Sequence, residues 1–220
     1  MSLLPVTVLV VAKAPSSGLA KTRLAATVGD QVAANIAAAA LLDTLDVVAA
    51  APVAAKVVAL TGDLETAAGA AEIRQRLDSF TVIQQRGTDF ADRLANAHAD
   101  AANGQPVLQI GMDTPQVTVD LLIDCARQLL KAPAVLGLAH DGGWWMLGVR
   151  HAAAAECLRA VPMSQPDTGE LTLKALHNNG IDVTRLEQLA DFDVVADVAA
   201  VRDACRPESR FAQVTRAAGL

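Results

Sequence analysis

The stretch Val6–Leu24 reads VTVLVVAKAPSSGLAKTRL and decides the fold, because an apolar run passes directly into a polar loop and then a helix. The apolar part, Val6–Ala12, is rich in β-branched residues and predicts a buried first strand. The loop brings three cations, two hydroxyls and a glycine to the end of that strand, where backbone N–H groups and fixed charge bind phosphate in α/β proteins. The candidate nucleotide and phosphate ligands are therefore Lys13, Pro15, Gly18, Lys21, Thr22 and Arg23.

The net charge and the aromatic content of the chain indicate which kinds of partner it can bind. The chain of 220 residues has a net charge of −6, so the cationic loop is a local exception and we expect no nucleic acid partner. Aromatic residues make up only 3%, which disfavours binding of single strands by base stacking. The three cysteines form no C-x-x-C pair, and no uncharged apolar run reaches 18 residues. We expect a cytoplasmic protein with reduced thiols and no membrane partner, and homo-oligomerisation stays open.

Apolar, β-branched runs alternate with Ala-rich helical patterns, which predicts an α/β fold. The predicted strands are Val6–Ala12, Lys56–Thr61, Phe80–Gln84, Val107–Gly111, Ala134–Leu138 and Trp145–Val149. The predicted helices are Asp30–Ala50, Asp63–Leu77, Asp89–Ala102, Val117–Leu130, Ala152–Arg159, Glu170–Asn178 and Ala196–Ala204. The pattern between Val107 and Val149 predicts a mixed sheet with one antiparallel member. With no linker in view, we expect a single domain over residues 1–206 and a loose tail over 207–220.

A carboxylate closes the fourth predicted strand at Asp113, within Val107–Pro115. Ligands of open α/β sheets lie beyond the carboxyl ends of the strands, so Asp113 should face the cationic loop. One such carboxylate, with phosphate and water, suits Mg²⁺. A helix cap after Pro115 is the structural alternative for Asp113.

The order of these motifs resembles a known family. The matching segments, in chain order, are Ala12–Pro15, Gly18, Lys21–Leu24, Asp89–Leu94, Gly111–Pro115, Leu136–Gly137, Asp141–Gly143, Leu147–Gly148, Asp191–Asp193 and Asp197. Together they resemble the bacterial GT-A-like glycosyltransferases of the radical-SAM/selenodomain-associated type. The layout is more distantly similar to molybdenum-cofactor and phospholactate guanylyltransferases. The resemblance implies a three-layer α/β/α fold with a mixed, mainly parallel sheet, the nucleotide-diphospho-sugar transferase fold.

The resemblance also implies roles for individual residues. Lys21 and Asp113 become the candidate catalytic residues, with Lys13, Lys21 and Arg23 facing phosphates and Asp113 facing Mg²⁺ or Mn²⁺. Asp193 aligns with a second metal ligand, although the Thr-Pro pair of related nucleotidyltransferases is replaced by Val194-Val195. Three alternatives stay open: a solvated loop cation for Lys13, a surface ion pair for Arg23, and a helix cap for Asp193.

The loop Asp141-Gly142-Gly143, followed by Trp144, is the candidate acceptor or sugar pocket under this resemblance. A plain hairpin turn is the alternative, because Asp-Gly is a strong hairpin signal. We expect one of the two tryptophans to face the pocket and the other the core. His140 is the one histidine that adjoins this candidate site.

Three functions remain open. The family resemblance favours a metal-dependent glycosyltransferase with a nucleotide-activated sugar donor and a small-molecule acceptor. The cationic loop equally suits a nucleotidyltransferase, resembling guanylyltransferases, that acts on a phosphorylated small molecule. The departures at Val194-Val195 and Trp144 leave room for a nucleotide-binding protein without turnover. Neither a Walker A frame nor G-x-S-x-G nor G-x-G-x-x-G occurs, which disfavours ATPase, hydrolase and Rossmann dinucleotide chemistry.

Overall fold

Seven strands form one sheet in the computed structural model, which describes residues 2–220. In the order β3-β2-β1-β4-β6-β5-β7, every described strand is parallel to the others except β6, which runs antiparallel to both of its neighbours. The strands are β1 (Leu4–Lys13), β2 (Val53–Thr61), β3 (Thr81–Gln84), β4 (Val107–Ile110), β5 (Ala134–Leu138), β6 (Trp144–Val149) and β7 (Val183–Arg185). The predicted mixed sheet with one antiparallel member is confirmed.

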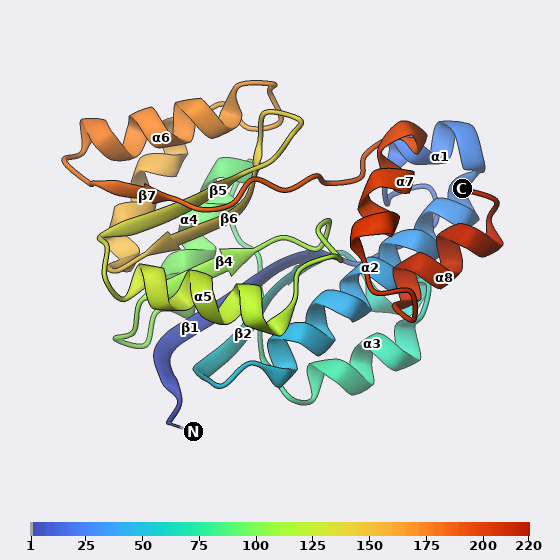
Figure 1. The fold of residues 1–220 in the computed structure, drawn as a ribbon, viewed down its shortest axis with the longest axis horizontal. Helices are drawn as coiled ribbons and strands as arrows, with labels where there is room; N and C mark the ends of the chain where they lie inside the picture. The colour runs from blue at the N-terminus through green and yellow to red at the C-terminus, as the bar shows by residue number, and fades with distance from the viewer. Residues whose placement is uncertain (1) are drawn as a thin grey trace.

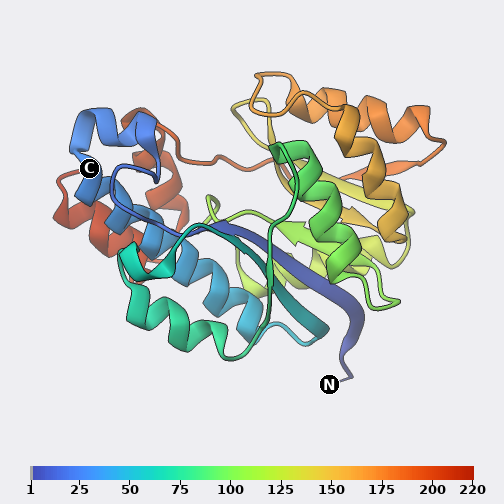
Figure 2. The same ribbon diagram turned by 180° about the vertical axis from the view of Figure 1, so that it is seen from behind.

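Helices cover both faces of this sheet. The helices are α1 (Thr22–Val28), α2 (Asp30–Ala50), η1 (Leu64–Thr66), α3 (Ala70–Leu77), α4 (Phe90–Ala101), α5 (Val119–Leu129), η2 (Ala152–Ala160), α6 (Thr168–Asn178), α7 (Val195–Ala204) and α8 (Arg210–Ala217). Helices α2, α3 and α5 lie on one face (Figure 1), and α4, η2 and α6 lie on the other (Figure 2). The three-layer α/β/α prediction is therefore confirmed.

Strand β1 shows how the sequence builds two cores. Successive side chains of a strand point to opposite faces, so Val8 and Val10 pack under α2, while Leu9 and Val11 pack toward α4. All four are buried because β1 is a central parallel strand with helices on both sides. The continuous apolar run is the direct consequence of this position.

Helix α2 is the one described helix that is long and apolar enough to cross a membrane. Its most apolar window is 72% buried inside the fold, against the sheet and against α1 and α8. Its eight alanines allow this close approach on several sides. Its apolar composition is thus accounted for by packing.

Two predicted helices differ from expectation. The helix expected over Asp63–Leu77 is divided into η1 and α3, because Gly69 takes the left-handed conformation with φ of 66° and stops the chain from continuing as one helix. The helix expected over Ala152–Arg159 is a 3-10 helix, η2. Helix α3 packs beside α2 on one face of the sheet, and η2 packs beside α4 on the other.

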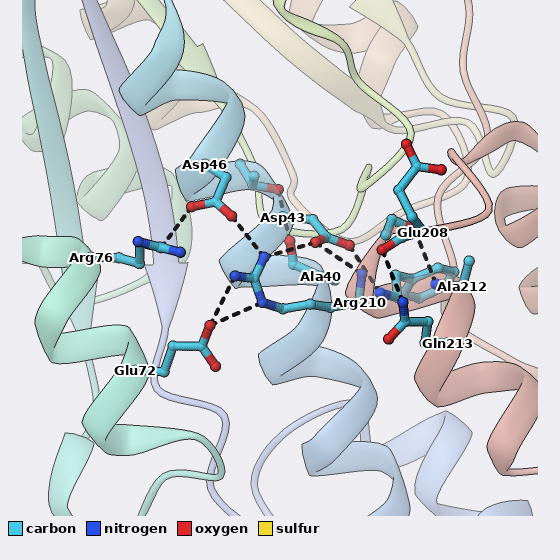
Figure 3. Close-up of polar contacts among 12 residues, drawn as sticks. Ala40, Asp43, Asp46, Glu72, Arg76, Glu208, Arg210, Ala212 and Gln213 are labelled. Carbon is cyan, nitrogen blue, oxygen red and sulfur yellow. Dashed lines mark hydrogen bonds and ion pairs between the residues drawn. The ribbon is translucent and has the colours of Figure 1, made fainter.

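The expectation of a loose tail over 207–220 is wrong, because these residues form α8 and pack on α2. Phe211 is fully buried and meets Phe192 at 4.7 Å between ring centroids. Asp43 of α2 accepts hydrogen bonds from the Phe211 N–H and from Arg210, whose guanidinium also reaches Asp46 and Glu72 (Figure 3). Apolar burial and this ion-pair network hold the C-terminus in place.

Candidate functional site

A cleft of about 470 Å³ opens at the carboxyl ends of the parallel strands. Its walls come from the ends of β1 and β4, the β5–β6 turn, the start of α4 and the segment after β7. A side pocket of about 400 Å³ adjoins it and is lined by the loop before α1. Asp113, Asp193, Lys13 and Arg23 line both spaces, so the predicted phosphate and metal residues meet at the boundary.

The long segment between β7 and α7 carries two carboxylates across the cleft. It runs beside β5, where the Leu186 N–H donates to Leu136 and the Leu189 N–H donates to Leu138, and then crosses to the helices α1, α7 and α8 (Figure 1). Asp191 and Asp193 lie on this crossing. Residues i and i+2 of an extended chain point to the same side, which is why both carboxylates face the cleft.

Lys21 is the centre of the charged network. Its ammonium lies 2.6 Å from Asp193 Oδ1 and 3.1 Å from Asp113 Oδ2, donates to the Phe192 carbonyl at 2.6 Å, and sits 4.3 Å from the centroid of the Phe192 ring. The residue takes a left-handed conformation with φ of 46° as it caps α1. Burial alone would lower the pKa of Lys21, but the two carboxylates outweigh it and raise the pKa, so the side chain stays cationic.

Arg23 completes the pairing of Asp193. Its guanidinium lies 2.5 Å from Asp193 Oδ2, while its own side chain stays 70% exposed. Burial acts to raise the pKa of Asp193, but Lys21 and Arg23 outweigh burial and lower it. Asp193 is therefore ionised and bound by two cations. The cap alternative is wrong, because Val194 is the residue at the N-terminal cap of α7 and Asp197 accepts from the N–H groups of Asp193 and Val194.

Asp113 keeps an unused oxygen. Its Oδ2 faces Lys21, whereas its Oδ1 is buried without a hydrogen-bond partner among residues 2–220. The cap alternative for Asp113 is also wrong, because Thr118 caps α5 by accepting from the Leu121 N–H. A buried carboxylate oxygen without a donor is a ready ligand for an added cation.

Three carboxylates form a second acidic group around Asp193. Oxygens of Asp141, Asp191 and Asp193 lie within 4.8 Å of one another. Burial, together with the charges of Asp141 and Asp193, raises the pKa of Asp191 to about 6. Oxygen ligands crowded in this way fit Mg²⁺ or Mn²⁺, both of which neutralise such charge. Asp113 was predicted to share the metal with Asp193, but it does not belong to this group of three carboxylates. It is linked to Asp193 by the Lys21 ammonium, which pairs with both residues.

The Asp141–Gly143 turn is a hairpin turn and also part of the cleft wall. Asp141 accepts from the Gly143 N–H at 2.7 Å. Gly142 has φ of 91°, and a Cβ there would lie 1.7 Å from the Pro166 carbonyl oxygen, so this position admits glycine alone. The turn therefore packs against the loop before α6, which contains Ser164 and Pro166, and Ser164 also lines both spaces.

Trp144 and Trp145 are consecutive residues of β6, so their side chains point to opposite faces of the sheet. Trp145 is 3% exposed in the α2-side core and donates to the Glu187 carbonyl. Trp144 is half-buried and donates to Thr172, and both tryptophans line the cleft. Trp144 is therefore the one with more ring surface free for a ligand.

Other predicted residues lie away from the cavity surface. Pro15 is buried and its carbonyl accepts from the Ala68 N–H, while Gly18 has φ of 77° and shapes the turn. Neither lines the two spaces, nor does His140, within the described chain. Thr22 lines the side pocket. Lys13 is exposed at the cleft, with its ammonium 2.8 Å from the Leu19 carbonyl.

Sequence reasoning gave no role to several residues of the cleft. Asp191 could have been found from the D-x-D spacing in an extended segment. Phe90, Arg93 and Gln109 also line the cleft, from α4 and β4. Phe90 and Arg93 lie in the segment Asp89–Leu94, which matches the resembled family but was given no role in the site. Gln109 has the pattern of an ordinary strand residue.

Comparison with solved structures identifies the fold to which this chain is similar. A protein from Desulfovibrio desulfuricans G20, provisionally assigned as a nucleotide-diphospho-sugar transferase, superposes with a TM-score of 0.84 at 22% identity over 99% of this chain and 95% of that one. Rv0371C from Mycobacterium tuberculosis H37Rv, solved in complex with manganese, gives 0.56 at 20% identity over 90% and 97%. CMP:2-keto-3-deoxy-manno-octonic acid synthetase, solved with CTP, gives 0.52 at 14% identity over 90% and 97%. The fold is that of nucleotide-diphospho-sugar transferases, as predicted.

The sequence comparison adds a family. No curated protein matches the chain. The family model described as "uncharacterized protein conserved in bacteria" (DUF2064) matches residues 44–165, which run from the last part of α2 to the loop before α6 and include Asp113 and Asp141. Since this match covers more than half of the 220 residues, the chain belongs to the DUF2064 family.

Proposed function

We propose that the protein is a transferase that requires Mg²⁺ or Mn²⁺ and uses a nucleotide-activated sugar as its donor. The observation that carries the proposal is the meeting of four carboxylates with Lys13, Lys21 and Arg23 at one edge of the sheet. The carboxylates Asp141, Asp191 and Asp193 would hold the cation, and Asp113 would lie next to it. A bound divalent ion supplies charge neutralisation at phosphate oxygens.

The chain's own cations supply the rest of the electrostatic stabilisation. Arg23 offers a planar fork to phosphate, and Lys13 and Lys21 offer point charges. In glycosyl transfer a nucleophilic atom of the acceptor forms a bond to the sugar carbon and gives up its proton. The bond between that carbon and the phosphate oxygen breaks, and the nucleoside diphosphate leaves with the bonding electron pair. The cations stabilise the charge that develops on that leaving group. Trp144 and the Asp141 turn line the same cleft and would contact the sugar or the acceptor.

Nucleotidyl transfer is the second candidate. Here an acceptor phosphate attacks the α-phosphorus and pyrophosphate leaves, and three cations around the loop suit that leaving group as well. Among the structures that share the fold, one was solved with CTP and another is a cytidylyltransferase from Leptospira borgpetersenii. The acceptor would then be a phosphorylated small molecule. The resemblance to radical-SAM-associated glycosyltransferases supports the first candidate, and a binder without turnover is the third.

The identity of the leaving group separates these candidates. The purified protein is incubated with nucleotide sugars, or with nucleoside triphosphates and sugar phosphates, in the presence of Mg²⁺, Mn²⁺ or EDTA. Release of nucleoside diphosphate indicates glycosyl transfer, and release of pyrophosphate indicates nucleotidyl transfer. Metal-dependent binding without either product indicates a binder.

A matched pair of variants tests whether the measured turnover depends on the carboxylates of the cleft. Asp113→Asn removes a cleft carboxylate charge, whereas Asp124→Asn removes an exposed one on α5 that pairs, within residues 2–220, only with Arg127. We expect turnover to fall at least about 100-fold in the first variant and to stay unchanged in the second. Equal turnover in both variants contradicts the proposed site.

A further inference from the structure

The end of the cleft next to α4 carries polar groups that the proposed phosphate and metal chemistry does not use. Phe90 and Arg93 lie three residues apart on α4 and therefore on one face of the helix. Phe90 is 41% exposed, and the Arg93 guanidinium lies 5.6 Å from the centroid of its ring. Both line the cleft. They form a flat platform with one aromatic face and one cation.

Arg93 lacks the partners that neighbouring arginines have. Arg86 pairs with Asp100, and Arg159 pairs with Asp92, both at less than 3 Å. Within residues 2–220 Arg93 forms no ion pair, and its Nε is buried without a hydrogen-bond acceptor. A buried donor without an acceptor costs free energy, and such groups are retained where a ligand supplies the acceptor.

Gln109 also lines this cleft and offers a hydrogen-bond acceptor, whereas Arg93 offers donors. It lies on β4 opposite Leu9 and Leu147, and so points toward the α4 side of the sheet. Its side chain is 3% exposed, lines the cleft, and leaves Oε1 without a donor in the described chain. His98 of α4 contacts Gln109, and this contact acts to raise the pKa of the ring, but neither ring nitrogen forms a hydrogen bond within residues 2–220. Gln85, by contrast, already donates to Ala12 and Ala59.

We propose that Phe90, Arg93 and Gln109 form the nucleobase pocket and select a base that presents two adjacent acceptors beside an N–H donor. The proposal rests on the proposed function, since it names the base of the same nucleotide. Phe90 offers a stacking face that any base can use. The Arg93 fork donates to an adjacent acceptor pair, and Gln109 Oε1 accepts from the neighbouring N–H group.

Two bases fit this pattern and two do not. Guanine offers N7 and O6 beside N1–H, and cytosine offers O2 and N3 beside its amino group. Adenine turns its amino group toward the arginine, and uracil lacks an adjacent acceptor pair. The pocket should therefore take guanine or cytosine nucleotides and reject the other two.

The test is calorimetric titration of the full chain, with Mg²⁺ present, against GTP, CTP, ATP, UTP and inorganic tripolyphosphate. We expect GTP or CTP to bind roughly 10- to 100-fold more tightly than ATP and UTP. The GTP and CTP arms distinguish a purine from a pyrimidine pocket. Arg93→Met and Arg93→Lys should both abolish the preference, since lysine keeps the charge and loses the fork. Arg127→Met, on the exposed surface of α5, is the matched control and should keep it.

Gln109→Leu tests the acceptor separately. Leucine suits the buried apolar strand, so the variant should fold, and it should weaken the base preference while tripolyphosphate binding stays unchanged. A lowered Tm with an unchanged preference would mean that Gln109 serves only the packing of His98, and would overturn its role.

The remaining outcomes separate two kinds of failure. Equal binding of all four nucleotides, or a preference for ATP or UTP, overturns the base pocket and leaves the proposed function standing. Tripolyphosphate binding as tight as that of the nucleotides does the same. Failure of every nucleotide and of tripolyphosphate to bind overturns both proposals.

Discussion

The ammonium of Lys21 lies 3.1 Å from the Asp113 carboxylate and bridges it to Asp193. This contact neutralises carboxylates that would otherwise repel each other in a site where the side chain of Lys21 is 8% exposed. A divalent cation and the Lys21 ammonium are therefore competitors for the same negative charge. Their competition leads to the first prediction.

Lys21→Met should tighten Mn²⁺ binding in the absence of nucleotide by at least about tenfold, because the competing positive charge is gone. In EDTA the same variant should lose roughly 5 °C of Tm, because two partly buried carboxylates lose the cation that lies between them. Added Mn²⁺ should restore the Tm. Calorimetry with Mn²⁺ and a thermal melt measure the two effects.

Lys13→Met is the control for that experiment. The Lys13 ammonium bonds the Leu19 carbonyl and not these carboxylates, so its loss should leave Mn²⁺ affinity nearly unchanged. If Lys21→Met instead weakens Mn²⁺ binding, Lys21 positions the carboxylates rather than competing for them.

The contact between Lys21 and Asp113 separates what the sequence could predict about the site from what it could not. The first strand, its cationic loop and the carboxylate at Asp113 were predicted from local pattern, and the structure brings all three to one cleft. The direction of Lys21 was not predictable. Its left-handed backbone and its partner Asp193, 172 residues away, depend on the packing of α7 beside α1.

Strand β7 and helix α8 were not predicted, and the two sequences differ in the signal they carry. Strand β7 has only three residues, two of them exposed, so it carries no apolar alternation. Helix α8 does carry a sequence signal, because Phe211, Ala212 and Thr215 form a buried stripe at helical spacing. That spacing predicts a packed helix rather than a loose tail.

Gly142→Ala should destabilise the protein by at least about 3 kcal/mol. The new Cβ would meet the Pro166 carbonyl oxygen at 1.7 Å, and φ of 91° is strained for any L side chain. The turn that holds Asp141 in the cleft must then move. Chemical denaturation measures the loss, and metal titration shows whether the acidic group is disturbed.

Gly104→Ala isolates the clash from the backbone strain. Gly104 has nearly the same φ, 86°, but nothing lies within 4 Å of its Cβ position. Its substitution should cost about 1 kcal/mol, the strain alone. Similar losses at the two positions would show that the turn at Gly142 yields freely, against this account of the cleft wall.

Phe211→Ala should lower the free energy of unfolding by about 3–5 kcal/mol, because the ring is fully buried between α2, α7 and Phe192. Gln213→Ala, on the exposed face of the same helix, should change it by less than about 0.5 kcal/mol. Urea denaturation of both variants makes the comparison. Equal stabilities would mean that α8 is not docked as Figure 3 shows it.

His98 predicts a specific pH dependence of stability. The ring is fully buried, and burial lowers its pKa to about 4, although contact with Gln109 opposes the shift. Because the unfolded state, with a pKa near 6.5, binds the proton more readily, protonation favours unfolding. The stabilisation from neutral His98 is complete above about pH 6.5 and is lost as the pH falls toward 4. Between pH 7.5 and pH 5 the loss from this residue should be about 2 kcal/mol.

Replacing the ring isolates this contribution. His98→Met removes the titrating group from an apolar site, so its free energy of unfolding should fall about 2 kcal/mol less between pH 7.5 and pH 5 than that of the wild type. His177→Gln, an exposed position on α6, should follow the wild-type curve. Urea denaturation at several pH values gives the three curves. If His98→Met and the wild type run parallel, His98 is protonated in the folded state and finds an acceptor, and the unpaired Gln109 Oε1 beside it is the group that would provide one.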